Sequence, residues 1–339
     1  MPGAGSEAEL QSTLTENNMT GNTNEKLIII AGPTAVGKSG TAVSIAERFN
    51  GEVVSADSMQ IYKGMDIGTA KVTAEEMRGI RHHLIDFKDP HEDYNVVEFQ
   101  YMASTAISDI NSRGKLPVLC GGTGFYIQAL LYGIDFSSEP PSDKENELRS
   151  SLREYAEKYG TAALHERLAG IDPESAESIP KENIKRVIRA IEFYELHGKK
   201  ISEHNRDEAL KRQHPLYDSI FIVLNDDRKK LYERIDKRVD KMLEAGLVDE
   251  VRRLLEAGVP ESSTAMQAIG YREIVSFLKG NVSLDGAVEL IKQNSRHYAK
   301  RQLTWFRREQ NTVWLNIGEC DATEEISRLI EAQSGRFGR

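Results

Sequence analysis

A glycine-rich segment at residues 31–39, AGPTAVGKS, is the clearest chemical signature in the chain and directly follows the apolar run KLIII. It fits the pattern GxxxxGK[ST], in which backbone N–H groups, a lysine and a helix N-terminus together bind phosphate oxygens. A hydroxyl at the last position can ligate Mg²⁺. We therefore predict a diphosphate-binding loop, with Mg²⁺ at Ser39, formed by Gly32, Thr34, Ala35, Val36, Gly37, Lys38 and Ser39. A plain glycine-rich turn is the alternative interpretation.

The same region gives little support for ATP hydrolysis. Nucleotide hydrolases usually hold Mg²⁺ with a second ligand, an aspartate that closes a buried strand. The apolar run PVLCGG ends without one, and HLIDF offers Asp86 only in a short context preceded by histidines. The loop thus predicts phosphate binding more strongly than it predicts ATP hydrolysis.

An aspartate follows the second apolar run, in the segment VVSADSMQIY. Because ligands of open parallel sheets lie at the carboxyl ends of the strands, Asp57 is predicted to lie beside the phosphate loop. A carboxylate there can take a proton from a hydroxyl or amine nucleophile, or orient it. The alternative is structural, since Asp57 or Ser58 could simply cap a turn.

One arginine falls within an apolar helical stripe. At helical spacing, Arg238 lies among Leu231, Ile235 and Met242. A guanidinium that faces a core needs an anionic partner. The partner could be a bound ligand or a buried carboxylate, and the sequence leaves both open.

Two further helical segments carry basic faces. In NIKRVIRAIEFYEL, we place Arg186, Arg189 and Phe193 on the face opposite the apolar residues. This combination suits a phosphodiester backbone and an unstacked base, and a solvated face with one stray phenylalanine is the alternative. In the segment from 288 to 308, basic residues recur at helical spacing without an intervening acid, at Lys292, Arg296, Lys300 and Arg307. Like charges on one helical face favour an anionic partner such as nucleic acid, although a solvated basic face is the alternative.

The elements that must position these residues alternate along the chain as strands and helices. The pattern predicts an α/β fold, a P-loop NTPase-like parallel sheet flanked by helices, with an all-helical insertion domain. Residues 1–24 lack a sustained apolar period and are predicted to be a disordered extension. Residues 25–136 and 202–339 form the predicted core, and only helical periods occur in 137–201.

Composition restricts the class of protein further. The 339 residues carry a formal net charge of −9, which argues weakly against a surface that embraces nucleic acid on all sides but allows a local basic face. Neither a membrane-spanning run nor a secretion signal is recognisable, so we expect a cytoplasmic protein. Cys120 and Cys320 lack metal-ligand spacing and are predicted to be reduced thiols without a chemical role.

Several motifs in order resemble one family. GPTAVGKS, SADSMQIYKGMDIGTAK, GGTGFY, NIKRVIRAIE, RIDKRVDKMLEAGLVDEV, AIGYREI and RHYAKRQLTWFRR are similar to segments of the bacterial tRNA dimethylallyltransferases, also called tRNA isopentenyltransferases. The resemblance runs from about residue 27 to about residue 315. It departs from the family in Ser39, where many members have threonine, and in the N-terminal extension.

The resemblance implies an activity and roles for individual residues. The family transfers a dimethylallyl group from dimethylallyl diphosphate to the exocyclic N6 amine of the adenosine just 3′ of the tRNA anticodon. By this likeness Lys38 and Arg238 would neutralise pyrophosphate, Asp57 would be the catalytic base, and Thr123 would lie beside the reacting groups. The implied partners are dimethylallyl diphosphate and the tRNA anticodon stem-loop, bound by a monomer with Mg²⁺. The tRNA contacts would come from Asp57, Ser58, Met59, Gln60, Lys185, Arg186, Arg189, Gln267, Gly270, Arg272, Arg296 and Lys300.

Two other functions use the same residues. A small-molecule phosphotransferase could employ the loop and Asp57, but it should show a strand-terminal aspartate and a cationic lid. A non-catalytic RNA-binding module that uses nucleotide as a switch would tolerate the loss of Asp57.

Overall fold

The computed structural model describes residues 25–134, 143–211 and 214–333, so the disordered extension predicted for 1–24 lies outside the described residues. The chain forms two compact units, one from Met1–Gly133 with Leu216–Arg339 and one from Ile134–Pro215. The predicted boundaries at 137 and 202 are close, but helix α10 (Ile201–Lys211), which we assigned to the core, belongs to the second unit. Its start is anchored there, because the Ser202 N–H donates to the buried Asp172 carboxylate.

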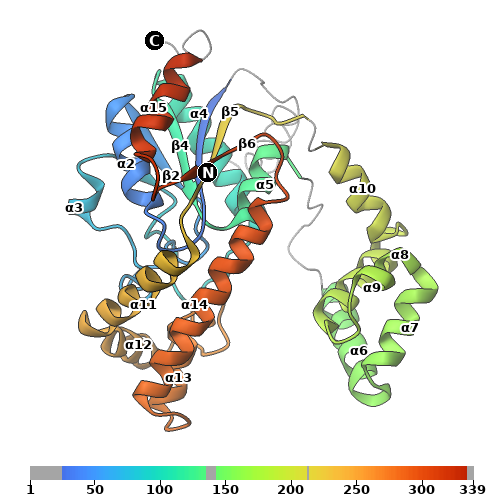
Figure 1. The fold of residues 1–339 in the computed structure, drawn as a ribbon. Coiled ribbons are helices and arrows are strands. Elements are labelled where there is room, and N and C mark those ends of the chain that lie inside the picture. The colour runs from blue at the N-terminus through green and yellow to red at the C-terminus, as the bar shows by residue number, and fades with distance from the viewer. Residues whose placement is uncertain (1–24, 135–142, 212–213, 334–339) are drawn as a thin grey trace, which may run out of the picture. The chain divides into compact units, whose positions relative to one another are not determined.

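The first unit is built on a parallel sheet, as predicted (Figure 1). All neighbouring strands pair in parallel. The edge strand β3 is shorter than the apolar run HLIDF because Leu84 and Asp86 have positive φ. The sheet order is β3 (His82–His83), β2 (Gly51–Ser55), β4 (Leu116–Gly121), β1 (Lys26–Ala31), β5 (Asp218–Asn225) and β6 (Thr312–Asn316).

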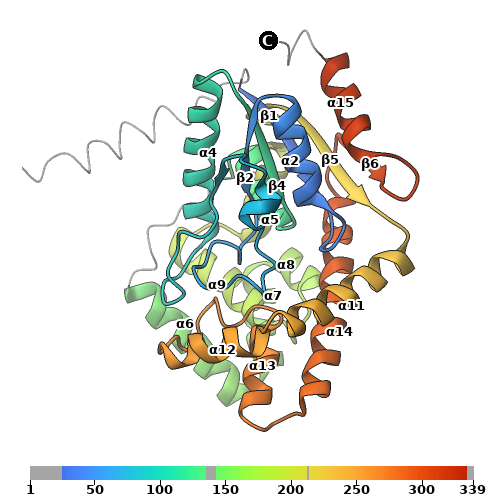
Figure 2. The ribbon, with the colours of Figure 1, turned by 90° about the vertical axis from the view of Figure 1, so that its left-hand side faces the viewer.

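Helices cover both faces of this sheet. On one face, α2 (Lys38–Arg48) and α15 (Ala322–Ala332) pack together, and their apolar side chains join those of the strands in one core cluster. On the other face lie α4 (Val96–Ser112) and α5 (Gly124–Tyr132), as Figure 2 shows. The side chain of Asn95 caps α4 by accepting from two N–H groups, which fixes where this helix begins.

Four helices extend beyond the sheet within the first unit: α11 (Arg228–Glu244), α12 (Leu247–Glu256), α13 (Tyr271–Leu278) and α14 (Leu284–Phe306). Both α11 and α13 pack against α14. The far end of α14 returns to the sheet, where Ala299 joins the main core cluster. A short helix, α3 (Ala74–Met77), begins at a capping box of Thr73 and Glu76.

The second unit is helical throughout its described residues, as predicted. It comprises α6 (Asp143–Tyr159), α7 (Thr161–Ile171), α8 (Pro173–Ser178), α9 (Ile184–His197) and α10. It has its own apolar core, in which Val187 and Ile191 of α9 are fully buried. Phe193 is buried too and contacts His197 and His204. Placing Phe193 on the exposed face with Arg186 and Arg189 was therefore wrong.

In the described parts of the chain, no helix is both long enough and apolar enough to cross a bilayer.

Candidate active site

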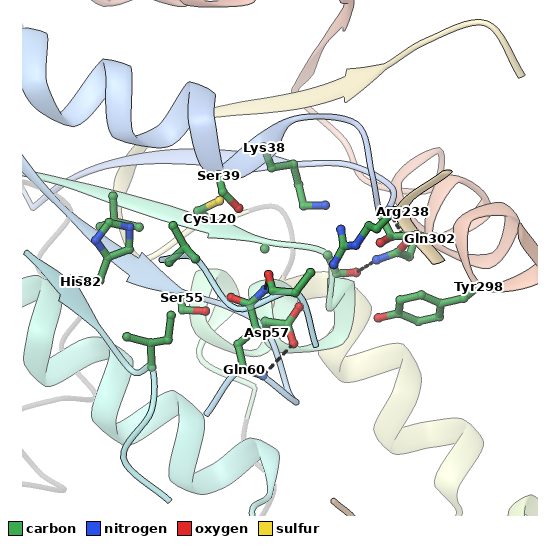
Figure 3. Close-up of a pocket in the computed structure, with 17 residues that line it drawn as sticks. Lys38, Ser39, Ser55, Asp57, Gln60, His82, Cys120, Arg238, Tyr298 and Gln302 are labelled. Carbon is green, nitrogen blue, oxygen red and sulfur yellow. Dashed lines mark hydrogen bonds between the residues drawn. The ribbon is translucent and has the colours of Figure 1, made fainter. Parts of the chain in front are cut away.

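A pocket opens at the carboxyl ends of the strands in the first unit (Figure 3). Strands β2 and β4, the start of α2 and one face each of α11 and α14 contribute to it. It lies where ligands of open parallel sheets bind. Its lining residues are Thr34, Lys38, Ser39, Val53, Ser55, Asp57, Gln60, Ala70, Val72, His82, Ile85, Cys120, Gly121, Gly122, Arg238, Tyr298 and Gln302.

The loop before α2 has the backbone shape that its glycines predicted. Gly32 has φ 145, and a Cβ there would lie 2.5 Å from the carbonyl oxygen of Leu224. Gly37, the N-cap of α2, has φ 93. At Gly32, both the positive φ and the close approach to Leu224 favour a residue without a side chain. The loop thus runs directly against β5 and brings the N-terminus of α2 to the pocket.

The members of the predicted diphosphate set take different positions. Thr34, Lys38 and Ser39 line the pocket. Val36 is buried and joins the sheet core, and Ala35 packs against that core at φ 62. Their side chains are structural, so any contact of these two residues with a diphosphate would come from the backbone.

The Thr34 amide has a partner inside the protein that the sequence did not reveal. Its N–H donates to Oε1 of Gln302 at 2.9 Å, and Nε2 of the same side chain donates to the Gly122 carbonyl at 2.9 Å. Gln302 is buried on α14 and therefore ties the phosphate loop to the turn after β4. This amide is occupied by Gln302 rather than facing the pocket. Thr34 keeps its side chain as the group that lines it.

Two cations share the pocket with a single carboxylate. Among the described lining residues, Lys38 and Arg238 are the cationic side chains other than the titratable His82, and Asp57 is the only acid. Burial lowers the pKa of Lys38 to about 8, with nearby Arg238 lowering it further and Asp57 opposing the shift. Burial lowers the pKa of Arg238 as well. Lys38 and Arg238 as whole residues are only partly buried. Because burial nevertheless lowers both pKa values, it is the charged ends of the side chains that have lost water.

The Arg238 guanidinium has no ion pair within 4 Å among the described residues. Its Nη2 donates only to the carbonyl oxygen of Thr69, at 3.2 Å. Asp57 supports its charge at longer range. Of the two partners that the sequence left open, a directly paired carboxylate is thus excluded. The site holds an excess of desolvated positive charge, which is the condition that favours binding of an anion.

The capping interpretation of Asp57 is confirmed, whereas its role as a catalytic base stays a prediction. One carboxylate oxygen, Oδ1, accepts hydrogen bonds from the N–H groups of Met59 at 2.9 Å and Gln60 at 3.2 Å, so the residue does cap a turn. The same side chain also lines the pocket (Figure 3). Capping occupies Oδ1 and leaves Oδ2 without a hydrogen-bond donor among the described residues. The turn therefore orients the carboxylate, and Oδ2 remains able to accept a proton.

Cys120 lies closer to the chemistry than we expected. It is buried at the end of β4, lines the pocket and adjoins the Ser39 hydroxyl (Figure 3). Burial raises the pKa of its thiol to about 11. The thiol therefore stays protonated near neutrality and is a poor nucleophile, which agrees with the prediction that it has no chemical role.

Thr123 forms the N-cap of α5 next to the pocket. Its hydroxyl is buried, adjoins the Tyr298 phenol and has no hydrogen bond of ordinary geometry within the described residues. Burial raises the pKa of Tyr298 to about 12, so the phenol remains a hydrogen-bond donor. The structure thus places Thr123 beside the pocket but not among the residues that line it.

Sequence reasoning missed several lining residues. Tyr298 and Gln302 stand one turn apart on α14, and their polar ends face the pocket from the helix that we read mainly for its charges. The other missed residues lie in or beside quoted motifs but were not assigned a role: Val53, Ser55, Ala70, Val72, His82, Ile85, Gly121 and Gly122. A buried glutamine in a helical stripe was the one signal that could have pointed to Gln302.

The residues assigned to tRNA are distributed over both units. Lys185, Arg186 and Arg189 are exposed on α9 of the helical unit. In the first unit, Gln267 and Arg272 are exposed, whereas Gly270 forms the N-cap of α13 at φ 101 and donates its N–H to Glu273. Ser58, Met59 and Gln60 are partly buried beside Asp57.

Two of the four cations in the predicted basic row are neutralised by acids of the same protein. Arg296 pairs with Asp236 at 2.6 Å and Lys292 with Asp240 at 2.7 Å, both acids being on α11. The expectation that this part of the row needs an external anion was wrong, because acids of a neighbouring helix had not been considered. Lys300 is exposed and has no ion pair among the described residues.

Comparison with known proteins identifies the family. The family model described as IPP transferase matches residues 60–309. A tRNA dimethylallyltransferase from Lachnoclostridium phytofermentans is 50% identical over 307 residues, which are 91% of this chain and 96% of the relative. This chain belongs to the IPP transferase family.

Solved structures of similar proteins agree. A tRNA isopentenylpyrophosphate transferase from Bacillus halodurans matches with TM-score 0.68 and 43% identity, covering 92% of this chain and 97% of that one. A eukaryotic dimethylallyltransferase, described as acting on tRNA, matches with TM-score 0.76 and 30% identity over 93% of this chain and 80% of that one. The family resemblance seen in the motifs is confirmed, and so is the fold. The roles of individual residues stay predictions.

Proposed function

We propose that this protein transfers a dimethylallyl group from dimethylallyl diphosphate to the exocyclic N6 amine of the adenosine 3′-adjacent to a tRNA anticodon and releases pyrophosphate. Membership of the family supports the reaction class. One structural observation carries the proposal at the level of chemistry: two desolvated cations and one carboxylate with a free oxygen line the same pocket.

The two cations serve the leaving group. In the reaction, the bond between the allylic carbon and the diphosphate oxygen breaks, and its electron pair stays on that oxygen. Lys38 and Arg238 offset the negative charge that develops there, and they do so in a site where lost water makes each interaction stronger. The N–H groups at the start of α2 add their partial positive charge.

Asp57 serves the nucleophile. As the adenine N6 forms its bond to the allylic carbon, the nitrogen must lose one proton. Oδ2 of Asp57 is the acceptor that the pocket offers, and the turn at Met59 and Gln60 holds it in place. The proton then passes to solvent, so the protein is unchanged after one turnover.

A magnesium ion fits the donor set at the start of α2. The Ser39 hydroxyl lines the pocket, and Mg²⁺ commonly takes most of its oxygen ligands from substrate phosphates and water. We propose that Ser39 helps to hold Mg²⁺, which would neutralise further charge on the diphosphate.

The nucleic acid must deliver one base into this pocket. An adenine in an anticodon loop has to leave its stack to reach a prenyl carbon. Exposed cations that have no ion pair to another described residue, such as Lys185 and Arg186 on α9 and Lys300 on α14, are suited to the tRNA backbone. Because one chain supplies the whole pocket, we propose that a monomer is active. We also propose that the protein binds tRNA in the cytoplasm.

The two alternative functions find less support. A phosphotransferase that uses ATP should have an aspartate closing a strand next to the loop, but β4 ends in Gly121. Asp226, which follows β5, lies outside the pocket lining and pairs with Arg234 at 2.7 Å. Asp86 lies outside the pocket and forms an ion pair with Lys71 at 2.6 Å. A purely binding module does not require a carboxylate whose free oxygen lies in the same pocket as two desolvated cations.

One experiment separates these functions. The protein is incubated with unmodified tRNA, Mg²⁺ and either labelled dimethylallyl diphosphate or labelled ATP, and the tRNA is then digested to nucleosides. We expect label from the prenyl donor in a modified adenosine. Transfer of label from ATP, or the absence of prenyl label in adenosine, would contradict the proposal.

A further inference from the structure

A buried carboxylate outside the pocket makes an unusual set of contacts. Glu250 on α12 is 2% exposed and receives four hydrogen bonds. Its Oε2 accepts from the backbone N–H groups of Asp66 at 2.9 Å and Ile67 at 2.8 Å, and Oε1 accepts from the N–H of Gly68 at 3.0 Å. The Tyr271 phenol on α13 donates to Oε1 at 2.6 Å. One carboxylate thus holds three consecutive amides of a loop.

That loop, residues 65–71, also contacts the pocket. The carbonyl of Thr69 accepts from the Arg238 guanidinium and from Nε2 of Gln60. The carbonyl of Ala70 accepts from Gln60 as well, and Ala70 itself lines the pocket. The contact to Thr69 is the only hydrogen bond of Arg238 to another described residue. The position of its charge therefore depends on where this loop lies.

The fit of the loop against Glu250 and Tyr271 is tight. A Cβ on Gly68 would lie 2.5 Å from the Tyr271 ring, so no side chain fits there without movement of the loop or the ring. Beyond Thr69, the Lys71 ammonium donates to the Tyr62 carbonyl at 2.7 Å and pairs with Asp86. The loop is thus fixed at both ends. Between these ends, the carbonyls of Thr69 and Ala70 accept hydrogen bonds from the pocket residues Gln60 and Arg238.

We propose that Glu250 is a positioning residue for the transfer reaction: by binding the amides of residues 66–68 it holds the Thr69 carbonyl where that carbonyl aims Arg238 at the diphosphate. This inference rests on the proposed function in one respect: it assumes that Arg238 binds the diphosphate of the substrate. Glu250 itself lies outside the pocket lining and acts through the loop. A carboxylate is required because its two oxygens accept from all four donors, whereas an amide would turn an N–H₂ group toward some of them.

The test replaces Glu250 without changing its size. In Glu250→Gln, we expect the dissociation constant for inorganic pyrophosphate to rise about 10-fold, while affinity for unmodified tRNA changes less than about twofold. In an Arg238→Gln background the same substitution should add less than about threefold, because the group that it positions is already gone. Additive effects in the double variant would contradict a route through Arg238.

Controls separate positioning from general stability. Asp172→Asn is matched, since Asp172 is also a buried carboxylate that accepts backbone N–H groups, those of Ser175 and Ser202, but it lies in the helical unit. It should leave pyrophosphate binding unchanged. Tyr271→Phe removes one of the four donors to Glu250 and should raise the dissociation constant for pyrophosphate by less than Glu250→Gln does. This variant provides the test if Glu250→Gln folds poorly. The thermal midpoint of each variant is measured alongside.

Amide hydrogen exchange gives a readout that does not depend on activity. The amides of residues 66–68 should exchange faster in Glu250→Gln than in the wild-type protein, and unchanged exchange would overturn the inference outright. If wild-type protein binds no pyrophosphate and labels no tRNA, the proposed function fails instead. If wild type binds and transfers while Glu250→Gln and Asp172→Asn behave alike, the positioning role alone is wrong.

Discussion

The cations of the pocket and the cations along the first half of α14 differ in what balances their charge. In the first half of α14, the two basic side chains each have an acid of their own: Lys292 has Asp240 and Arg296 has Asp236. In the pocket, Lys38 and Arg238 share Asp57, and neither forms an ion pair within 4 Å among the described residues. The first set is neutral as a group and structural, whereas the second carries net positive charge.

The two sets of cations also differ in how their surroundings shift the lysine pKa. The hydrogen bond that Lys292 donates to Asp240 raises the pKa of Lys292, so the fold stabilises its charged form. Burial lowers the pKa of Lys38 to about 8, so its charged form is less stable than that of an exposed lysine, although it still prevails at neutral pH. A protein that leaves a lysine in this condition loses stability to do so, because charge is desolvated without a full partner. This difference favours the pocket over the paired row as the anion site in the proposed function.

The largest effect is expected at the single carboxylate of the pocket. Asp57→Ala should lower the transfer rate by about 10²–10⁴-fold, the range for loss of a general base. Pyrophosphate should bind at least as well as before, because two cations then lack their shared acid. Rates and pyrophosphate affinity are measured separately. Asp57→Asn keeps an oxygen for the turn at Met59 and Gln60, so wild-type transfer by this variant would reduce Asp57 to a cap.

A smaller effect is expected from pH. The charged form of Lys38 binds the diphosphate, and its pKa in the free protein is about 8. Affinity for dimethylallyl diphosphate should therefore be level below pH 8 and fall up to about 10-fold per pH unit above it. Titration calorimetry across this range provides the measurement. Lys38→Arg should bind with no such decline, since a guanidinium stays charged; an identical decline would assign the titration to another group.

The smallest effect should distinguish the paired row from the exposed cation further along the same helix. Lys300→Gln should weaken tRNA binding about threefold to 10-fold and reduce the slope of log affinity against log salt by about one. Lys292→Gln should change tRNA affinity less than about twofold, because Asp240 already balances that charge. Filter binding at several salt concentrations tests both variants. Equal losses would show that the ion pair opens when tRNA binds.

Much of the fold could be predicted because its signals are local. The strand before the phosphate loop, the helix that starts at Lys38 and the cap at Asn95 all lie within a few residues of the pattern that predicts them. The end of the helical unit was placed too early because Ser202 is held by Asp172, a residue 30 positions away. Contacts over such separations leave no periodic trace in the chain.

The candidate site also combines residues that the sequence predicted with features that depend on tertiary packing. The loop chemistry of Lys38 and Ser39, the candidate base Asp57 and the buried Arg238 follow from residue types and spacing, and the structure brings all of them to one pocket. Spacing also suggested that Phe193 shares an exposed face with Arg189, but packing within the helical unit buries it. Periodicity assigns a residue to a face of a helix, and only neighbouring elements decide whether that face is covered.

By itself, the sequence determined the α/β fold, the phosphate loop and the residues that carry charge at the carboxyl ends of the strands, since these depend on short-range pattern. Only the tertiary structure decided which charges remain unbalanced. Asp236 and Asp240 neutralise one basic row from a different helix, Gln302 occupies an amide of the phosphate loop, and Glu250 holds the loop that contacts Arg238. Each of these depends on side chains distant in sequence meeting in space, where electrostatic and hydrogen-bond energies are set by distance and burial.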